Sequence, residues 1–188
     1  LTTSANGANS VYAADLDGDE PQLSISGGAD AALFSINRST GQLTFKRAPD
    51  FEQPADANGD NLYEVEVTVT DSSGATDMQS FAITVANAHE APSFTTHEGY
   101  ASVGLSVPEN STSVTFVSAA DPDAGTNLTY SLHGLDSSKF TLDTSTGALS
   151  FAVAPDYENA EDNDTNNFYE VMVQASDGEF KATQAFSI

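Results

Sequence analysis

Apolar and polar residues alternate along several short stretches of the chain. In the clearest stretch, residues 63–70, every second residue is Tyr63, Val65, Val67 or Val69, and the residues between them are Glu or Thr. Because successive side chains of a strand point to opposite faces, this pattern predicts strands with one buried face. The same alternation is shown by Leu23 with Ile25, Leu43 with Phe45, Phe81 with Ile83 and Val85, Leu128 with Tyr130 and Leu132, and Tyr169 with Val171, Val173 and Ala175.

Turn sequences separate these stretches, among them Ser39-Thr40-Gly41 and Ser72-Ser73-Gly74. No segment carries the sustained apolar stripe that is typical of a helix. Several short strands per hundred residues, punctuated by Gly, Asp and Asn, predict an all-β fold made of β-sandwiches.

The chain contains an internal repeat. Shifting it by 106 residues aligns residues 28–71 with residues 134–177 without a gap, and 19 of the 44 pairs are identical. A period of this length corresponds to one small domain, so the sequence predicts two tandem domains, residues 1–88 and 89–188. Copy two opens with residues 93–106, which have no counterpart before Leu1. We therefore expect domain 1 to lack its first strand or to obtain it elsewhere.

Composition narrows the possible partners. The chain has 28 acidic and 5 basic residues, and 5 − 28 gives a net charge of −23. Nucleic acids and anionic membranes attract clustered Lys and Arg, so neither is expected as a partner. The 39% of hydrophobic residues, with 11 Phe and 6 Tyr, favours a folded chain over an acidic disordered one. Cysteine is absent, which excludes disulfides and thiol chemistry.

The two ends of the chain and its hydropathy bear on localisation. It starts without Met and ends within an apolar alternation, so we expect a piece of a longer protein. No apolar run is long enough to span a membrane, so no membrane insertion of this segment is expected.

The acidic residues gather in four clusters that recur in both copies. They are Asp15-Leu16-Asp17-Gly18-Asp19 with Asp121-Pro122-Asp123, Asp50-Phe51-Glu52 with Asp156-Tyr157-Glu158, residues 56–61 with residues 162–167, and Asp71 with Asp177. Calcium takes six to eight oxygen ligands, which such spacings can supply. Asp and Asn also favour turns and keep surfaces soluble, but recurrence of all four clusters in two otherwise divergent copies favours calcium.

Each copy resembles a bacterial cadherin-type repeat, as found in large secreted calcium-dependent adhesins of the RTX type. The resemblance depends on Pro108-Glu109-Asn110, the Asp-x-Asp and Asp-x-Glu motifs, the Thr-Gly-x-Leu turn, the Tyr-Glu-Val strand ending in Asp, and the linker ending Glu90-Ala91-Pro92. It implies two tandem cadherin-like, Ig-like Greek-key β-sandwich domains with several calcium ions between consecutive domains.

The resemblance implies a calcium junction whose ligands come from both copies. Copy one would contribute Asp50, Glu52, Asn87 and Glu90, and copy two Asp121, Asp123 and Asp177. Thr3 stands where copy two has Glu109, and the linker has Asn87 and His89 where the family usually has Asp and Asn. The full set of candidate ligands is Asp15, Asp17, Asp19, Asp50, Glu52, Asp56, Asn58, Asp60, Asp71, Asn87, Glu90, Glu109, Asp121, Asp123, Asp156, Glu158, Asp162, Asp164 and Asp177.

Three functions fit these features. The first is a calcium-dependent adhesion module of an extracellular bacterial surface protein, which captures a peptide or glycan on another cell. The second is a calcium-stiffened spacer that contacts neighbouring repeats of the same chain and no other ligand. The third is a pair of accessory domains in a secreted carbohydrate-active enzyme.

Catalysis by this segment itself is not expected. Glycoside hydrolysis needs one asymmetric pair of carboxylates across a cleft, whereas these clusters are duplicated. The chain has three histidines, His89, His97 and His133. His89 and His97 flank the linker, which leaves a zinc pair as an alternative to exposed, solvated histidines.

Overall fold

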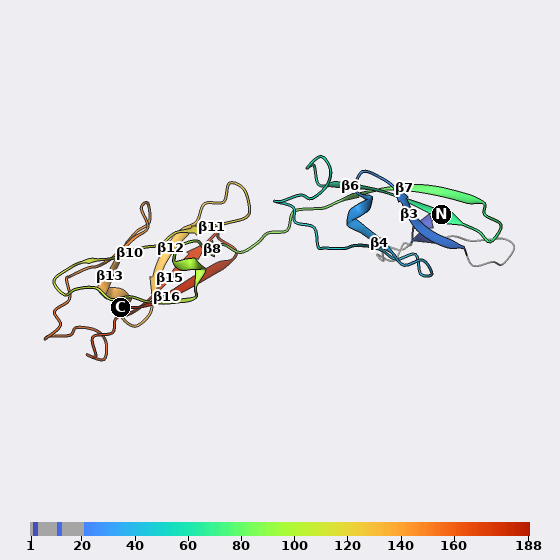
Figure 1. Ribbon diagram of the computed structural model, residues 1–188. Coiled ribbons are helices and arrows are strands. Elements are labelled where there is room, and N and C mark those ends of the chain that lie inside the picture. Colours follow the sequence, from blue (N-terminus) through green and yellow to red (C-terminus); the bar gives the residue numbers. More distant parts are fainter. Residues whose placement is uncertain (1, 4–10, 13–20) are drawn as a thin grey trace. The chain divides into compact units, whose positions relative to one another are not determined.

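The computed structural model describes residues 2–3, 11–12 and 21–188 (Figure 1). The chain divides into two compact units, unit 1 (Leu1–Ala88) and unit 2 (His89–Ile188). The regular elements in the described residues are strands and three single-turn 3₁₀ helices, as the alternating pattern predicts.

Unit 1 contains two antiparallel sheets and a short ribbon, which join strands β3-β6-β7, β4-β5 and β1-β2. Tyr63, Val65 and Val67 are at most 1% exposed, which confirms the buried face predicted for residues 63–70. The bounds are β1 Thr2–Thr3, β2 Val11–Tyr12, β3 Gln22–Gly27, η1 Ala31–Leu33, β4 Phe34–Ile36, β5 Leu43–Phe45, β6 Leu62–Thr70 and β7 Thr76–Thr84.

Unit 2 has larger sheets, in the orders β12-β15-β16-β9 and β10-β14-β13, together with the ribbon β11-β8. All its strand pairs are antiparallel except β16 with β9. The bounds are β8 Ser93–Phe94, η2 His97–Gly99, β9 Ser102–Gly104, β10 Ser113–Phe116, β11 Ala119–Ala120, β12 Thr129–His133, η3 Ser137–Lys139, β13 Phe140–Asp143, β14 Ala148–Phe151, β15 Glu170–Ser176 and β16 Lys181–Ser187.

The two units differ at one sheet edge. In unit 2, β9 pairs in parallel with β16 and comes from the opening segment that copy one lacks. In unit 1, β7 corresponds to β16, and no strand pairs with its second edge among the residues described there.

The same aromatic cluster lies in the core of each unit. Phe34, Phe45 and Tyr63 have ring centroids 4.5, 6.4 and 5.1 Å apart, and their counterparts Phe140, Phe151 and Tyr169 have 4.6, 6.3 and 5.0 Å. Edge-on contacts to the tyrosine account for two distances in each cluster, an arrangement that aromatic quadrupoles favour. The tyrosine hydroxyl then accepts a backbone N–H 3.2 Å away from the acidic loop that precedes the long strand, at Ala55 in unit 1 and Glu161 in unit 2. The core thereby fixes one side of that loop.

The repeated Thr-Gly turn requires glycine in both units. Gly41 and Gly147 have φ angles of +69° and +75°, and a Cβ at either position would overlap the carbonyl oxygen of Val11 or Val117. Their own carbonyls accept the N–H of those same valines at 2.8 Å. The turn therefore lies directly against a buried valine of the core.

Candidate metal centre

One end of unit 2 gathers acidic side chains from three separate segments. Asp121 and Asp123 directly follow β11, and Asp177 directly follows β15. Glu90 lies just before β8, and β8 pairs with β11, which brings Glu90 next to Asp123. We call Glu90, Asp121, Asp123 and Asp177 the acidic cluster of unit 2.

The Asp-x-Asp turn leaves one carboxylate oxygen with nothing to bind. Oδ1 of Asp121 accepts the backbone N–H of Asp123 at 2.9 Å, which closes the turn. Oδ2 of Asp121 is buried and has no hydrogen-bond partner. A buried carboxylate oxygen without a partner costs free energy, so the site favours a cation there.

Asp123 contacts the chain that enters unit 2. Its Oδ2 lies 2.6 Å from Nδ1 of His89 and accepts the backbone N–H of Glu90 at 3.1 Å. The Asp123 side chain is 11% exposed. These contacts fix the entering segment on the acidic cluster.

Asp177 is the most buried member of the cluster. Its Oδ1 accepts the backbone N–H groups of Glu179 and Phe180, each at 2.6 Å, and its side chain is fully buried. Oδ2 has no hydrogen-bond partner and lies 3.5 Å from Nε2 of His89. The hairpin turn after β15 thus aims one carboxylate oxygen at the imidazole.

His89 lies between two carboxylates and against an aromatic ring. Burial lowers the pKa of His89, but the hydrogen bond to Asp123 and the charges of Asp123, Asp177 and Glu179 outweigh it, so the pKa is raised. The ring of Phe180 packs on the imidazole with centroids 5.3 Å apart. A positive group next to these carboxylates is therefore favoured even without an ion.

The donor set of this cluster fits calcium. It offers carboxylate oxygens, which calcium prefers, and two of them are buried and lack hydrogen bonds. The charges of Asp123 and Asp177 face the same imidazole and repel each other, and a divalent cation would turn that repulsion into attraction. Glu90, Asp121, Asp123 and Asp177 would hold the ion.

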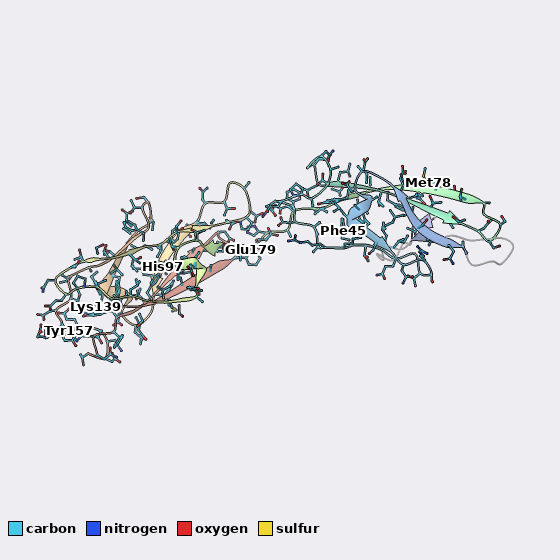
Figure 2. All side chains as sticks on the ribbon, viewed as in Figure 1. Phe45, Met78, His97, Lys139, Tyr157 and Glu179 are labelled. Carbon is cyan, nitrogen blue, oxygen red and sulfur yellow. The ribbon has the colours of Figure 1, made fainter. Side chains whose placement is uncertain are left out.

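A second acidic group lies at the opposite end of unit 2, where Figure 2 shows Tyr157 far from Glu179. Glu109, Asp156 and Glu158 are exposed, and each places a carboxylate oxygen within 4.8 Å of the others. Oε2 of Glu109 accepts the N–H of Tyr157 at 3.0 Å, and Oδ1 of Asp156 accepts the N–H of Glu158 at 3.1 Å. The Pro-Glu-Asn and Asp-x-Glu motifs therefore lie side by side.

In unit 1 the counterpart of Asp156 is Asp50. Its Oδ1 accepts the N–H groups of Glu52 and Gln53, each at 3.0 Å. Asp156 makes the first of these bonds in unit 2, and Glu52 is partly buried. The junction that the sequence predicts between Asp50 and Glu52 and the acidic cluster of unit 2 stays a prediction.

In the third predicted cluster, residues 56–61, the acidic side chains mostly hydrogen-bond within their own loop. Oδ2 of Asp56 accepts the N–H of Asp60 at 2.9 Å, and Asn58 donates to Asp60 at 2.8 Å. Burial raises the pKa of Asp56, but backbone N–H groups, that of Asp60 foremost, lower it further. One oxygen, Oδ1 of Asp56, remains buried without a hydrogen bond.

The equivalent loop of unit 2 is built in the same way. Asp162 is 4% exposed and accepts the N–H groups of Asn166 and Asn167 at 2.9 and 3.1 Å. A hydrogen bond to Asp162 raises the pKa of Asp164. Both oxygens of Asp162 bond to backbone, so loop closure accounts for its burial.

The remaining predicted ligands belong to unit 1, and some of them lie outside the described residues. Oδ1 of Asp71 accepts the hydroxyl of Ser73 at 2.8 Å and the N–H of Ala75 at 2.7 Å, and these bonds lower its pKa. Asn87 is exposed in unit 1. Asp15, Asp17 and Asp19 lie outside the described residues.

The sequence did not single out two buried aspartates as functional or structural residues. Asp30 and Asp136 are each 4% exposed, and each accepts two backbone N–H groups. Asp30 bonds to Ala57 and Glu64 at 2.7 and 2.8 Å, and Asp136 bonds to Asn163 and Glu170 at the same distances. They join the acidic loop to the long strand. Both copies have Asp at this position, which was a signal in the sequence. A single Asp, however, is not part of a spaced motif that would distinguish it from other aspartates.

His97, the second histidine of the zinc pair that the sequence left as an alternative, is held by other contacts. Nε2 of His97 lies 3.0 Å from the hydroxyl of Thr115, and its ring packs edge-on against Phe186 with centroids 5.4 Å apart. His97 is therefore held by β10 and β16, within the body of unit 2 (Figure 2).

Known proteins resemble this chain in sequence and fold. Residues 104–186 match the family model described as cadherin domain, and residues 1–84 match the one described as bacterial Ig domain. The structure of human protocadherin-24 EC1-2 (form II) matches with a TM-score of 0.52 at 22% identity, over 95% of this chain and 85% of that one. Drosophila N-cadherin EC1-4 matches with a TM-score of 0.52 at 24% identity, over 95% and 42%.

The chain has a cadherin-like fold. Sequence relatives agree: human protocadherin Fat 4 is 29% identical over 159 residues, 82% of this chain, and human protocadherin Fat 1 is 34% identical over 130 residues, 68% of this chain. The chain spans 3% of the length of each of these relatives. The all-β fold with tandem cadherin-like sandwiches is thus confirmed, while the cadherin match lies within unit 2 and the Ig match within unit 1.

Proposed function

We propose that this chain is a calcium-binding adhesion module of a large extracellular bacterial surface protein. The observation that carries the proposal is the acidic cluster of unit 2, in which buried oxygens of Asp121 and Asp177 have no hydrogen-bond partner. Cadherin-like domains generally bind calcium and mediate adhesion, and the match of unit 1 to a bacterial Ig domain supports a bacterial origin.

Calcium at the cluster would supply positive charge where carboxylates converge. Asp121 and Asp123 on one turn and Asp177 on another belong to different strands, so their shared ion would tie β11 to the end of β15. Glu90 would add the entering segment to the same ion. The cluster would therefore stiffen the start of unit 2.

The exposed group of Glu109, Asp156 and Glu158 is suited to contact with other molecules. An ion held there by side chains on one face would keep coordination positions open toward solvent. A neighbouring repeat or a carboxylate or pair of hydroxyls on a peptide or glycan could fill them. If a peptide or glycan fills these positions, the chain captures a ligand. If a neighbouring repeat fills them, the chain is a spacer.

Calorimetric titration with calcium tests the metal site. Wild-type protein should bind calcium and melt at a higher temperature than in chelator, because an ion that binds the folded state at about 100 times its Kd stabilises it by about 2.7 kcal/mol. Asp121→Asn and Asp177→Asn should each lose most of this shift. Asp143→Asn, which alters a turn on another strand of unit 2, should keep it. Equal melting of wild type in calcium and chelator would contradict the proposal.

The adhesive function needs a second experiment. Glycan arrays and peptide panels are probed with the whole chain in calcium and in chelator. We expect at least one ligand that is retained only in calcium and lost in a Glu109→Gln, Glu158→Gln double variant. Binding of calcium without any such ligand would favour the spacer.

A further inference from the structure

His89 is held in the arrangement that metal-binding histidines use. Such a histidine donates one ring N–H to a carboxylate, which fixes the tautomer, and binds the metal through the other nitrogen. Here Nδ1 lies 2.6 Å from Oδ2 of Asp123, a group that can only accept while it is ionised. A metal that displaces the remaining proton then meets the lone pair on Nε2.

A fully buried oxygen faces that nitrogen at a distance that suits a bridging ion. Oδ2 of Asp177 lies 3.5 Å from Nε2 of His89, which is longer than the usual 2.7–3.2 Å of an N–H···O hydrogen bond. A tetrahedral ion with metal–nitrogen and metal–oxygen distances of about 2.0–2.2 Å separates two of its ligands by about 3.3–3.6 Å. The observed gap therefore matches the span across such an ion.

Both partners are fixed before any ion arrives. The other oxygen of Asp177 accepts two backbone N–H groups, so its carboxylate cannot turn freely. The imidazole plane is held between Asp123 and the ring of Phe180. The His89 side chain is 37% exposed, so water can reach the ion and complete its coordination.

We propose that His89 and Asp177 bind a late first-row divalent transition ion, with Zn²⁺ as the probe, and that Asp123 positions His89 for it. Imidazole favours zinc, nickel and copper over calcium, which prefers oxygen ligands throughout. The inference rests on the proposed function in that Asp177 belongs to the proposed calcium cluster. Zinc and calcium would therefore compete for it.

Titration calorimetry of the whole chain with Zn²⁺ in calcium-free buffer tests the inference. His89→Asn should weaken zinc binding by about tenfold or more, since even outer-shell changes at metal sites cost about 10–100-fold. His133→Asn is the matched control, because His133 lies on β12 and contacts the hydroxyl of Ser131. It should bind zinc as wild type does. Equal zinc affinity in wild type and His89→Asn, or no zinc binding by wild type, overturns the inference.

Two further measurements separate this result from the calcium proposal. ¹⁵N chemical shifts of the His89 ring should show Nε2, and not Nδ1, as the atom that binds zinc; a response at Nδ1 would overturn the geometry. Calcium titration of His89→Asn should still show calcium binding, since Glu90, Asp121, Asp123 and Asp177 are all retained. Absence of calcium binding in wild type, with zinc binding that depends on His89, would contradict the proposed function and leave this inference intact.

Discussion

Individual aspartates in this chain have different roles although their sequence contexts look alike. Asp177 and Asp121 each keep one buried oxygen without a hydrogen bond, and Asp162 bonds both of its oxygens to backbone N–H groups. Asp136 does the same and is as deeply buried as Asp162, since each is 4% exposed. The free oxygens mark candidate ligands, and the bonded ones mark structural aspartates.

Loss of a structural aspartate should cost stability without affecting metal binding. Asp136→Ala leaves the N–H groups of Asn163 and Glu170 without their partner. Hydrogen bonds to charged groups contribute about 1.5–3 kcal/mol each, and part of that returns through water, so unfolding free energy should fall by about 2–4 kcal/mol. Urea denaturation measures it. A fall below about 1 kcal/mol, or loss of calcium affinity in the folded variant, would count against this role.

The turn at Asp143 should give a pH-dependent stability. Hydrogen bonds from Ser145, first its side chain and then its backbone, lower the pKa of Asp143 to about 2. A carboxyl with a depressed pKa stabilises the fold above its unfolded value and loses that effect as pH falls through its folded value. The melting temperature of Asp143→Asn should therefore lie below wild type at pH 5, and the gap should close by pH 2.

Unit 1 offers a reciprocal control for that turn. Asn37 occupies the equivalent position, and its Oδ1 accepts the N–H groups of Ser39 and Thr40, each at 3.0 Å. Asn37→Asp should raise the melting temperature at pH 5 and have no effect near pH 2. A gap for Asp143→Asn that stays constant over this pH range would refute the assignment.

Among the elements, short turns determine where the strands lie against the core. The Thr-Gly turn joins β13 to β14 and hydrogen-bonds to Val117, and its glycine carries a positive φ in both units. The long strands β6 and β15 are each followed directly by an Asp, Asp71 or Asp177, whose side chain accepts N–H groups of the hairpin turn. Residues that are identical in the two copies therefore include those whose backbone conformation or turn hydrogen bonds restrict the residue type.

Gly147→Ala should destabilise unit 2 by about 2 kcal/mol or more, because it combines left-handed backbone strain with overlap on the Val117 carbonyl. Gly104→Ala is the control, since nothing lies within 4 Å of a Cβ there and its φ is ordinary. Thermal melts of the two variants compare them directly. A similar loss of melting temperature in both variants would show that the turn does not pack closely against Val117.

Across the whole chain, the charge of −23 is the dominant property. No helix in the described part of the chain is long and apolar enough to cross a membrane. Each calcium ion would neutralise two of the negative charges, whereas monovalent salt screens them without binding at a particular position. The two effects can be separated by experiment.

Calcium should raise the melting temperature more than magnesium or sodium chloride at equal ionic strength. Magnesium demands regular octahedral geometry and gives up its water reluctantly, so a carboxylate cluster of irregular shape favours calcium. Native mass spectrometry then counts the bound ions. Equal stabilisation by all three salts would mean that screening alone acts on the acidic residues.

The sequence by itself determined the alternating strands, the internal repeat and the types of residue in the acidic clusters. Alternation and turn residues are local properties, and Tyr63 and Tyr169, which the alternation places on one face, lie in the aromatic clusters of the cores. The tertiary structure decided which carboxylates converge. Asp123 and Asp177 lie 54 positions apart in the sequence and come within reach of one imidazole, while Asp162 is taken up by its own loop. Whether an aspartate can bind an ion depends on which N–H groups surround it, and that is known only once the chain has folded.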